Sequence, residues 1–289
     1  MRVAILGAHG FIGRNLGYKL HALGHEVTGY VLNHDLSCSN QFKCESVLEL
    51  LNTPSNDLKF YDVTINLAAR RATNLQPYTQ EQVSKFTFEI PKEYILRTAG
   101  PKSLVINSST YIQNFEGIPG RTVDSYGAAK EKLSTFLAHD SLKFQFKSVD
   151  VYLFTLYGEG DRSSHLVPLL LESAFSGNEI SLSPGYQLMN LLYIDDAIEN
   201  ILKILERPTT IGYHKYYLWS DEYFSVRELV ERIQASIGRE INTNWGGRDY
   251  VGHEMMKPWT IPMAQIEGFE VKTTLNEGIK KIWSTLSLD

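Results

Sequence analysis

The chain has 289 residues, of which 43% are hydrophobic and 21% charged, and its formal net charge is −5. This size predicts one large α/β domain with a smaller second lobe. The mild acidity argues against a nucleic-acid partner, and no apolar stretch approaches the roughly 20 residues that span a bilayer. We therefore expect neither nucleic acid nor membrane as a partner.

Strand-like and helical patterns alternate through the first half of the chain, which favours a parallel sheet with right-handed crossovers. Pro91 should kink the helix expected at 80–99. The expected fold class is α/β, a Rossmann-type doubly wound parallel sheet with a smaller mixed α/β C-terminal lobe. In chain order, strands are expected at 2–6, 25–31, 62–69, 103–109 and 148–158, with helices at 10–23, 47–51, 80–99 and 125–139.

Beyond Gly158 the elements become shorter and less regular. We place a dinucleotide-binding Rossmann domain at 1–157 and a mainly substrate-binding lobe at 158–289. The segment 193–206 predicts a helix that returns to the first domain.

The two cysteines, Cys38 and Cys44, match no zinc-ligand spacing. They predict free thiols in a reducing cytoplasm, with a regulatory disulfide as the alternative. No metal site is expected.

The stretch GAHGFIG, residues 7–13, follows the first strand and opens the first helix. Backbone N–H groups at such a turn bind a pyrophosphate, although a plain tight turn also favours glycine. The second strand ends at Val31 without the acid that usually holds an NAD ribose. This absence favours NADP over NAD, with Arg14 and His34 as basic candidates for the extra phosphate.

The stretch SYGAAK places Tyr126 and Lys130 four residues apart, on one face of a predicted helix. An adjacent ammonium favours the phenolate, which makes such a tyrosine a usable acid or base. The preceding strand ends in Ser108, Ser109 and Thr110, whose hydroxyls are candidates to orient a substrate oxygen. By itself the pair also fits chance spacing, and the hydroxyls fit a simple polar strand end.

Together with INLAA, INSSTYIQ, LFTLYGEGD, LVPLLLESAFSG, LLYIDDA and LNEGIKKI, these stretches resemble the extended short-chain dehydrogenase/reductases, the NAD-dependent epimerase/dehydratase family. The resemblance runs nearly the full length and is closest to 4-ketoreductases of the CDP-abequose and CDP-paratose synthase type. It implies reduction of the 4-keto group of a nucleotide-linked deoxysugar for surface polysaccharide. It also implies a cytoplasmic protein and allows a homodimer.

By that resemblance Tyr126 donates the proton, Lys130 lowers its pKa and holds the nicotinamide ribose, and Ser108 or Thr110 shares the carbonyl hydrogen bond, with Ser109 third. Arg70 and Arg71 follow the strand at 62–69, where α/β sheets bind ligands. The remaining expected cofactor-binding residues are Gly7, Gly10, Phe11, Ile12, Gly13, Leu67, Ala68 and Ala69, and the expected substrate-binding residues are Arg70, His165 and Arg248.

One departure from the family concerns the arginine that commonly grips the nucleotide diphosphate, where this chain has Met189 and Asn190. Arg248 is the substitute we expect. Two alternatives to the reductase remain: a nucleotide-sugar 4-epimerase with tightly bound NAD, and a non-catalytic NAD(P)-binding sensor or scaffold. The acidic pair Asp195 and Asp196 fits a helix start.

Overall fold

The computed structural model describes residues 1–32, 41–72, 77–161, 165–207, 210–252, 254–259 and 264–286. The chain divides into two compact units. Unit 1 contains Met1–Leu153, Ile201–Tyr217 and a short segment ending at Ile266. Unit 2 contains Phe154–Asn200 and most of the chain after Leu218.

Unit 1 is built on a seven-stranded sheet with the order β10-β6-β5-β4-β1-β2-β3. The pairings that join β3 to β6 through the middle of the sheet are all parallel, so the expected Rossmann-type α/β class is confirmed. The chain order reverses at β1, which places β2 on one side and β4 on the other, and such a reversal opens a ligand crevice in α/β sheets. The strands are β1 (Arg2–Leu6), β2 (Glu26–Val31), β3 (Lys43–Ser46), β4 (Tyr61–Asn66), β5 (Ala99–Thr110), β6 (Lys147–Leu153) and β10 (Gly212–Leu218).

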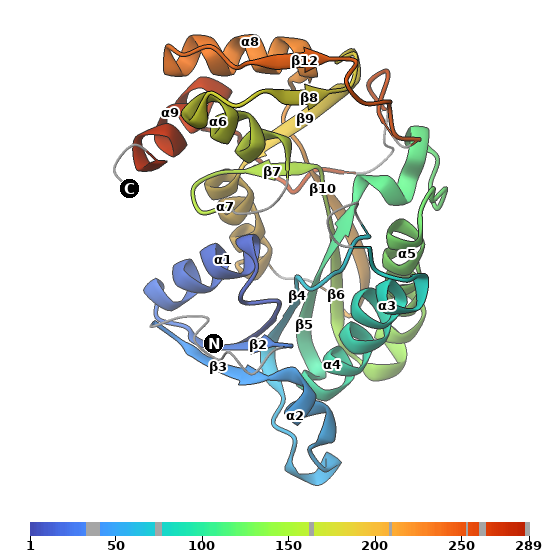
Figure 1. Ribbon diagram of the computed structural model, residues 1–289. Coiled ribbons are helices and arrows are strands. Elements are labelled where there is room, and N and C mark those ends of the chain that lie inside the picture. Colours follow the sequence, from blue (N-terminus) through green and yellow to red (C-terminus); the bar gives the residue numbers. More distant parts are fainter. Residues whose placement is uncertain are drawn as a thin grey trace. The chain divides into compact units, whose positions relative to one another are not determined.

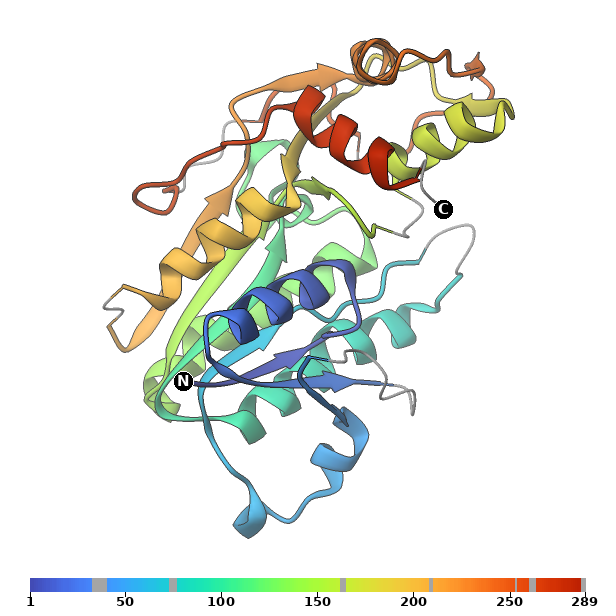
Figure 2. The same cartoon turned by 90° about the vertical axis from the view of Figure 1, so that its left-hand side faces the viewer.

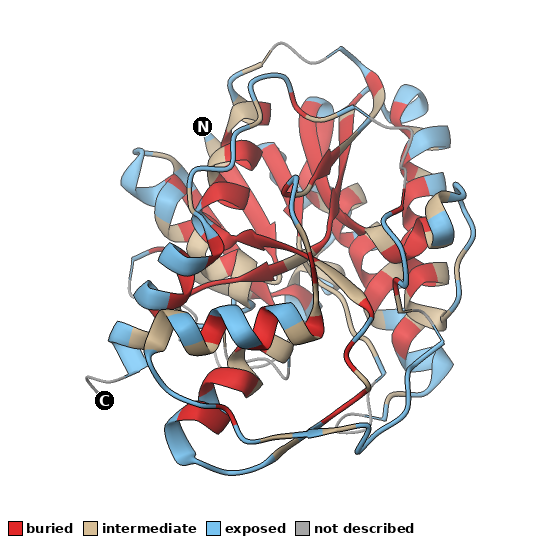
Figure 3. Cartoon of the chain, turned by 90° about the horizontal axis from the view of Figure 1, so that it is seen from above, coloured by how far each residue is buried: buried red, intermediate tan, exposed pale blue. Residues whose placement is uncertain are grey.

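Helices cover both faces of this sheet, with α1 on one face and α3, α4 and α5 on the other (Figure 1). Figure 2 is turned so that α1 lies in front of the sheet. Side chains alternate along a strand, so Ala4 and Leu6 of β1 join the core formed with Tyr94 and Leu133. The strands between the helices are buried almost throughout (Figure 3). The helices are α1 (Phe11–Ala22), α2 (Val47–Asn52), α3 (Gln80–Ser84), α4 (Ile90–Thr98) and α5 (Ser125–Phe144).

The helix expected at 80–99 is interrupted by a π-helical turn, Lys85–Glu89, between α3 and α4. Pro91 is the second residue of α4, two positions after the end of this turn. Proline has no N–H to donate, and its ring crowds the carbonyl four residues earlier, so the regular ladder cannot continue through it. The expected kink is therefore a π turn, a feature that often accompanies functional sites.

Unit 2 contains a three-stranded sheet, β11-β9-β7, and a two-stranded sheet, β12-β8. The helix expected at 193–206 is α7, whose last residues cluster with unit 1. No helix in the described part of the chain is long and apolar enough to cross a membrane. The elements are β7 (Thr155–Tyr157), α6 (Leu166–Ser176), β8 (Ile180–Leu182), β9 (Leu188–Tyr193), α7 (Ile194–Leu205), β11 (Tyr223–Ser225), α8 (Val226–Ile237), β12 (Thr243–Trp245) and α9 (Leu275–Leu286).

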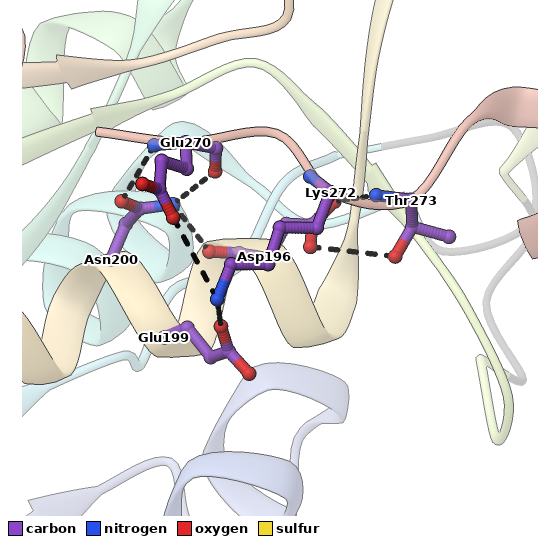
Figure 4. Close-up of polar contacts among 6 residues, drawn as sticks. All are labelled: Asp196, Glu199, Asn200, Glu270, Lys272 and Thr273. Carbon is purple, nitrogen blue, oxygen red and sulfur yellow. Dashed lines mark hydrogen bonds and ion pairs between the residues drawn. The ribbon is translucent and has the colours of Figure 1, made fainter. Parts of the chain in front are cut away.

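Asp196, in the first turn of α7, fastens the segment before α9 (Figure 4). Its Oδ2 accepts hydrogen bonds from the backbone N–H groups of Lys272 (3.2 Å) and Thr273 (2.9 Å). One turn later, Asn200 Nδ2 donates to the carbonyl of Glu270 (2.8 Å). Asp196 is buried, and its carboxylate is occupied by these structural contacts.

The expectation of free thiols is wrong for Cys44, which is disulfide-bonded. Cys38 lies outside the described residues. The alternative noted from the sequence, a disulfide, is the one that applies to Cys44.

A chain of buried polar side chains crosses β4, β5 and β6. Asn66 Nδ2 donates to Asn107 Oδ1 (2.7 Å), and Asn107 Nδ2 donates to Asp150 Oδ1 (2.7 Å). Tyr213 of β10 donates its hydroxyl to the other oxygen of Asp150 (2.7 Å). These contacts satisfy polar groups that have no access to water, and such groups are costly when left unpaired.

We expect Asn107→Ala to lower the free energy of unfolding of unit 1 by roughly 3 kcal/mol, because it leaves the Asn66 amide and the Asp150 carboxyl without their shared partner. Urea unfolding followed by circular dichroism measures this loss. Asn15→Ala removes an amide that donates to the Phe11 carbonyl within α1 and should cost less than about 1 kcal/mol. Equal losses of unfolding free energy in the two variants would contradict the stabilising role given to these buried hydrogen bonds.

Candidate active site

The glycine turn after β1 lies against the end of β4. Gly7 has φ +84° and donates its N–H to the carbonyl of Tyr30 (3.0 Å). A Cβ on Gly7 would lie 2.9 Å from the backbone nitrogen of Ala68, closer than side-chain carbons approach. Only glycine therefore combines this backbone angle with this close approach.

Gly13 is the third glycine of the turn and is buried beneath it. A Cβ there would lie 2.2 Å from the carbonyl oxygen of Gly7. Helix α1 begins at Phe11, and its N-cap, Gly10, makes no side-chain capping bond. The first backbone N–H groups of α1 are consequently not covered by a side chain of the cap, as a phosphate-binding turn requires.

A cavity of about 320 Å³ opens beside this turn. Five of the expected cofactor residues line it: Gly7, Gly10, Leu67, Ala68 and Ala69. The rest of the lining consists of Leu6, His9, Tyr30, Val31, Leu32, Arg70 and Phe86. The described residues of the lining include no carboxylate, and the glycine turn is a cradle that a Cβ would fill, so these residues fit the pyrophosphate and ribose of a dinucleotide.

Tyr126 and Lys130 lie one turn apart near the start of α5. Lys130 is only 1% exposed, and its Nζ donates to the carbonyl oxygen of Ser108 (2.6 Å) and to Ser108 Oγ (3.2 Å). The buried ammonium thus ties α5 to the carboxyl end of β5.

The three candidate hydroxyls at this strand end have different neighbours. Ser108 contacts Lys130, as just described. Ser109 Oγ lies 3.3 Å from the Oγ of Ser134, which belongs to α5. Thr110 is the N-cap of the 3-10 turn that follows and forms a capping box with Gln113. Of the three, Ser108 is the hydroxyl that lies beside the Lys130 ammonium.

The pKa values of the pair depart from ordinary values in opposite directions. Burial raises the pKa of Tyr126 to about 12, an effect that the nearby Arg71 opposes and that Asp124 and Tyr111 reinforce. Burial lowers the pKa of Lys130 from 10.5 to about 8, against the attraction of Asp150. The sequence led us to expect a lowered pKa at Tyr126, whereas its desolvation outweighs the favourable charge.

The expected substrate residues are distributed over both units. Arg70, in unit 1, lines the dinucleotide cavity and lies over the ring of Tyr78, 5.6 Å from its centroid. Thr87 of the π turn holds it by accepting from the Arg70 N–H (3.0 Å) and donating to the Arg70 carbonyl (3.1 Å). In unit 2, His165 is the exposed N-cap of α6, and Arg248 is exposed after β12.

The residues at the position of the missing diphosphate-binding arginine have structural contacts in unit 2. Asn190 is buried, and its Nδ2 donates to the carbonyls of Ser220 (2.6 Å) and Glu222 (3.0 Å). Met189 pairs with Phe224 of β11. Arg14, the basic candidate near the glycine turn, is not in the lining of the dinucleotide cavity, and His34 lies outside the described residues.

Sequence reasoning missed two residues of this region. His9 lines the dinucleotide cavity. Asp124 is the N-cap of α5, and its Oδ1 accepts from the N–H of Gly127 (2.7 Å). An aspartate directly before a helical pattern is a capping signal, so the role of Asp124 could have been predicted from the sequence. The position of His9 could not, because it depends on the backbone path of the glycine turn.

A parallel Rossmann-type sheet, a glycine turn after its first strand and a Tyr–Lys pair on the helix after β5 are typical of dinucleotide-dependent dehydrogenases and reductases. The family model described as "NAD dependent epimerase/dehydratase family" matches residues 3–218. The chain therefore belongs to this family, the extended short-chain dehydrogenase/reductases expected from the sequence, and it is an NAD(P)-dependent enzyme of that type.

The individual relatives have low sequence identity to this chain. The chain is 26% identical to a CDP-abequose synthase of Yersinia pseudotuberculosis over 89% of this chain and 92% of that protein. It is 20% identical to a CDP-abequose synthase of Salmonella muenchen over 98% of this chain and 97% of that protein. A solved structure of UDP-glucuronic acid 4-epimerase from Bacillus cereus, in complex with UDP-glucuronic acid and NAD, has a TM-score of 0.83 at 18% identity, covering 100% of this chain and 99% of that one. At that identity the structural likeness concerns the fold.

We expect Gly13→Ala to weaken NADH and NADPH binding at least about tenfold, because the added methyl group forces the turn away from the Gly7 carbonyl. Titration of nicotinamide fluorescence measures the affinity. Gly24→Ala is the control, because it adds the same methyl group at a glycine whose Cβ would meet nothing within 4 Å, although the φ of Gly24, +81°, disfavours alanine. The control should lose stability and keep its cofactor affinity; unchanged affinity in Gly13→Ala would count against the turn as the phosphate site.

Lys130 should make the protein more stable as pH rises above 8. The folded state holds a lysine with a pKa of about 8, whereas the unfolded chain has the ordinary 10.5. Below pH 8 both states are charged, and the folded state carries the full cost of the buried ammonium. Above pH 8 the folded state releases its proton first, so this cost declines and is gone above the unfolded pKa.

The expected gain between pH 7 and pH 9.5 is about 2 kcal/mol relative to Lys130→Met, in which the titrating group is absent. Urea unfolding of both proteins at the two pH values gives the difference, and other titrating groups cancel in the comparison. Parallel pH dependence of the two proteins would show that the pKa of Lys130 is not lowered.

Proposed function

We propose that the protein is an NADPH-dependent reductase of the 4-keto group of a nucleotide-linked deoxysugar. The observation that carries the proposal is the phenol of Tyr126, one helical turn from a buried lysine that is bonded to Ser108. The match to two CDP-abequose synthases over most of their length supports this substrate class. Arg70, His165 and Arg248 are the proposed substrate residues, and the nucleotide and the sugar are left open.

In this reaction Tyr126 donates its proton to the carbonyl oxygen of the substrate, and Ser108 donates a hydrogen bond to the same oxygen. Reduced nicotinamide, when bound, supplies the hydride that the carbonyl carbon accepts. The carbonyl becomes an alcohol, and Tyr126 is left as a phenolate that regains a proton from solvent. Lys130 fixes Ser108 and adds positive charge beside the phenolate.

The end of β2 supports NADP as the cofactor. Val31 and Leu32 line the cavity where an NAD-binding sheet usually has an acid. Arg70 and His9 line the same cavity, and a positive lining favours an extra phosphate. An NAD-dependent 4-epimerase is the alternative reaction, and the absence of an acid at Val31 and Leu32, the described residues at the end of β2, is what favours the reductase over it.

The first test is to titrate the purified protein separately with NADH and NADPH and to assay it for cofactor that survives purification. The reductase should bind NADPH exchangeably and more tightly than NADH. Copurifying NAD would instead identify the epimerase, and failure to bind either cofactor would exclude both enzymes.

We further expect Tyr126→Phe to lower the NADPH-dependent reduction of a panel of nucleotide-linked 4-ketosugars at least about 100-fold, because the proton donor is lost. NADPH affinity should stay within about threefold, since the ring is retained. Tyr18→Phe, on α1, is the matched control and should keep full activity. A Tyr126→Phe protein that binds NADPH and retains its biological activity without turnover would favour a sensor.

A further inference from the structure

An ion pair lies beside the start of the helix that carries Tyr126. Arg71 Nη2 is 3.3 Å from Asp124 Oδ2, and the guanidinium carbon of Arg71 is 5.7 Å from the centroid of the Tyr126 ring. The other carboxylate oxygen of Asp124 caps α5 through Gly127. One carboxylate therefore contacts both the helix of the phenol and the arginine that lies over its ring.

The two charges come from separate elements. Arg71 belongs to the loop after β4, and Asp124 lies 53 positions further along the chain. Both side chains are largely covered, with 36% of the Arg71 side chain and 27% of the Asp124 side chain exposed. Their fields at the phenol are consequently screened less than those of exposed surface charges.

Lys130, one turn along α5, directs its ammonium to Ser108. Three charged or titratable groups act on the Tyr126 phenol in the described structure, Arg71, Asp124 and Tyr111, and Lys130 follows one turn along the same helix. Arg71 lowers the pKa of the phenol, whereas Asp124 and Tyr111 raise it. The guanidinium is permanently charged, unlike a buried lysine that titrates near neutral pH.

We propose that Arg71 is a positioning residue for the reaction: held by Asp124, it supplies the positive charge that stabilises the Tyr126 phenolate formed when the phenol gives up its proton. This inference rests on the proposed role of Tyr126 as proton donor. The Asp124 carboxylate both caps the helix and holds Arg71 in place. Its own negative charge, however, destabilises the Tyr126 phenolate. Removing Arg71 and removing the charge of Asp124 should therefore move the titration of Tyr126 in opposite directions.

The test is an NMR titration of protein labelled with ¹³C at Cζ of tyrosine, from pH 8 to pH 11, with the Tyr126 signal assigned by its loss in Tyr126→Phe. In Arg71→Met the fraction of phenolate at pH 11 should fall roughly tenfold, a shift of about one pH unit. In Asp124→Asn, which keeps a good capping residue, it should rise several-fold. Arg71→Lys retains the charge and should lie between Arg71→Met and the unchanged protein.

Arg70→Met is the matched control, because it removes the same charge from the adjacent position, where the guanidinium faces Tyr78. It should leave the titration of Tyr126 unchanged. An unchanged titration in Arg71→Met, or shifts of the same sign in Arg71→Met and Asp124→Asn, would overturn the inference. The titration needs no turnover, so failure of the proposed reaction is read separately, from the reduction assay of Tyr126→Phe.

Discussion

Asn66, Asn107 and Asp150 lie side by side on three neighbouring strands, and the proposed site in unit 1 depends on the hydrogen bonds between them. The sheet register pairs Asn66 with Asn107 and Asn107 with Asp150. A slip of one residue would turn these side chains to the opposite face and leave them unpaired. Because Leu67 and Ser108 directly follow two of these residues, the same bonds fix the wall of the dinucleotide cavity and the hydroxyl beside Lys130.

Much of this arrangement was predictable from local patterns. The strands before the glycine turn and before Tyr126 are marked by short apolar runs bounded by turn residues, and the spacing of Tyr126 and Lys130 indicates a shared helix face. Side-chain alternation along a strand also predicts that Ser108 and Thr110 point the same way and Ser109 the other. It did not predict Ser134 as the partner of Ser109, because Ser134 reaches it only through the packing of α5. The pairing of Thr110 with Gln113 is instead a local capping box three residues apart.

Other features depend on distant contacts that no local pattern carries. No local sequence pattern around β10 indicates that this strand pairs with β6, which lies about sixty residues earlier in the chain. The charge balance at Tyr126 is a similar case: the sequence shows Lys130 one turn away, but the partly buried ion pair of Arg71 and Asp124 forms only once the loop after β4 meets the start of α5. The direction expected for the pKa shift of Tyr126 was wrong because burial is the larger effect. Burial has no signature in a short motif.

The late position of β10 in the chain has a consequence for how the protein is made. A ribosome must synthesise the chain through Tyr213 before the edge of the first sheet is complete and before the hydroxyl of that residue can reach Asp150. Until then β6 is an open edge, with backbone groups free to pair with another strand. By that time all of β7, α6 and β9 has been made. The synthesis of the two units is therefore interleaved, because part of unit 2 is made before the first sheet is complete and the rest after it, unlike in a chain whose domains are contiguous.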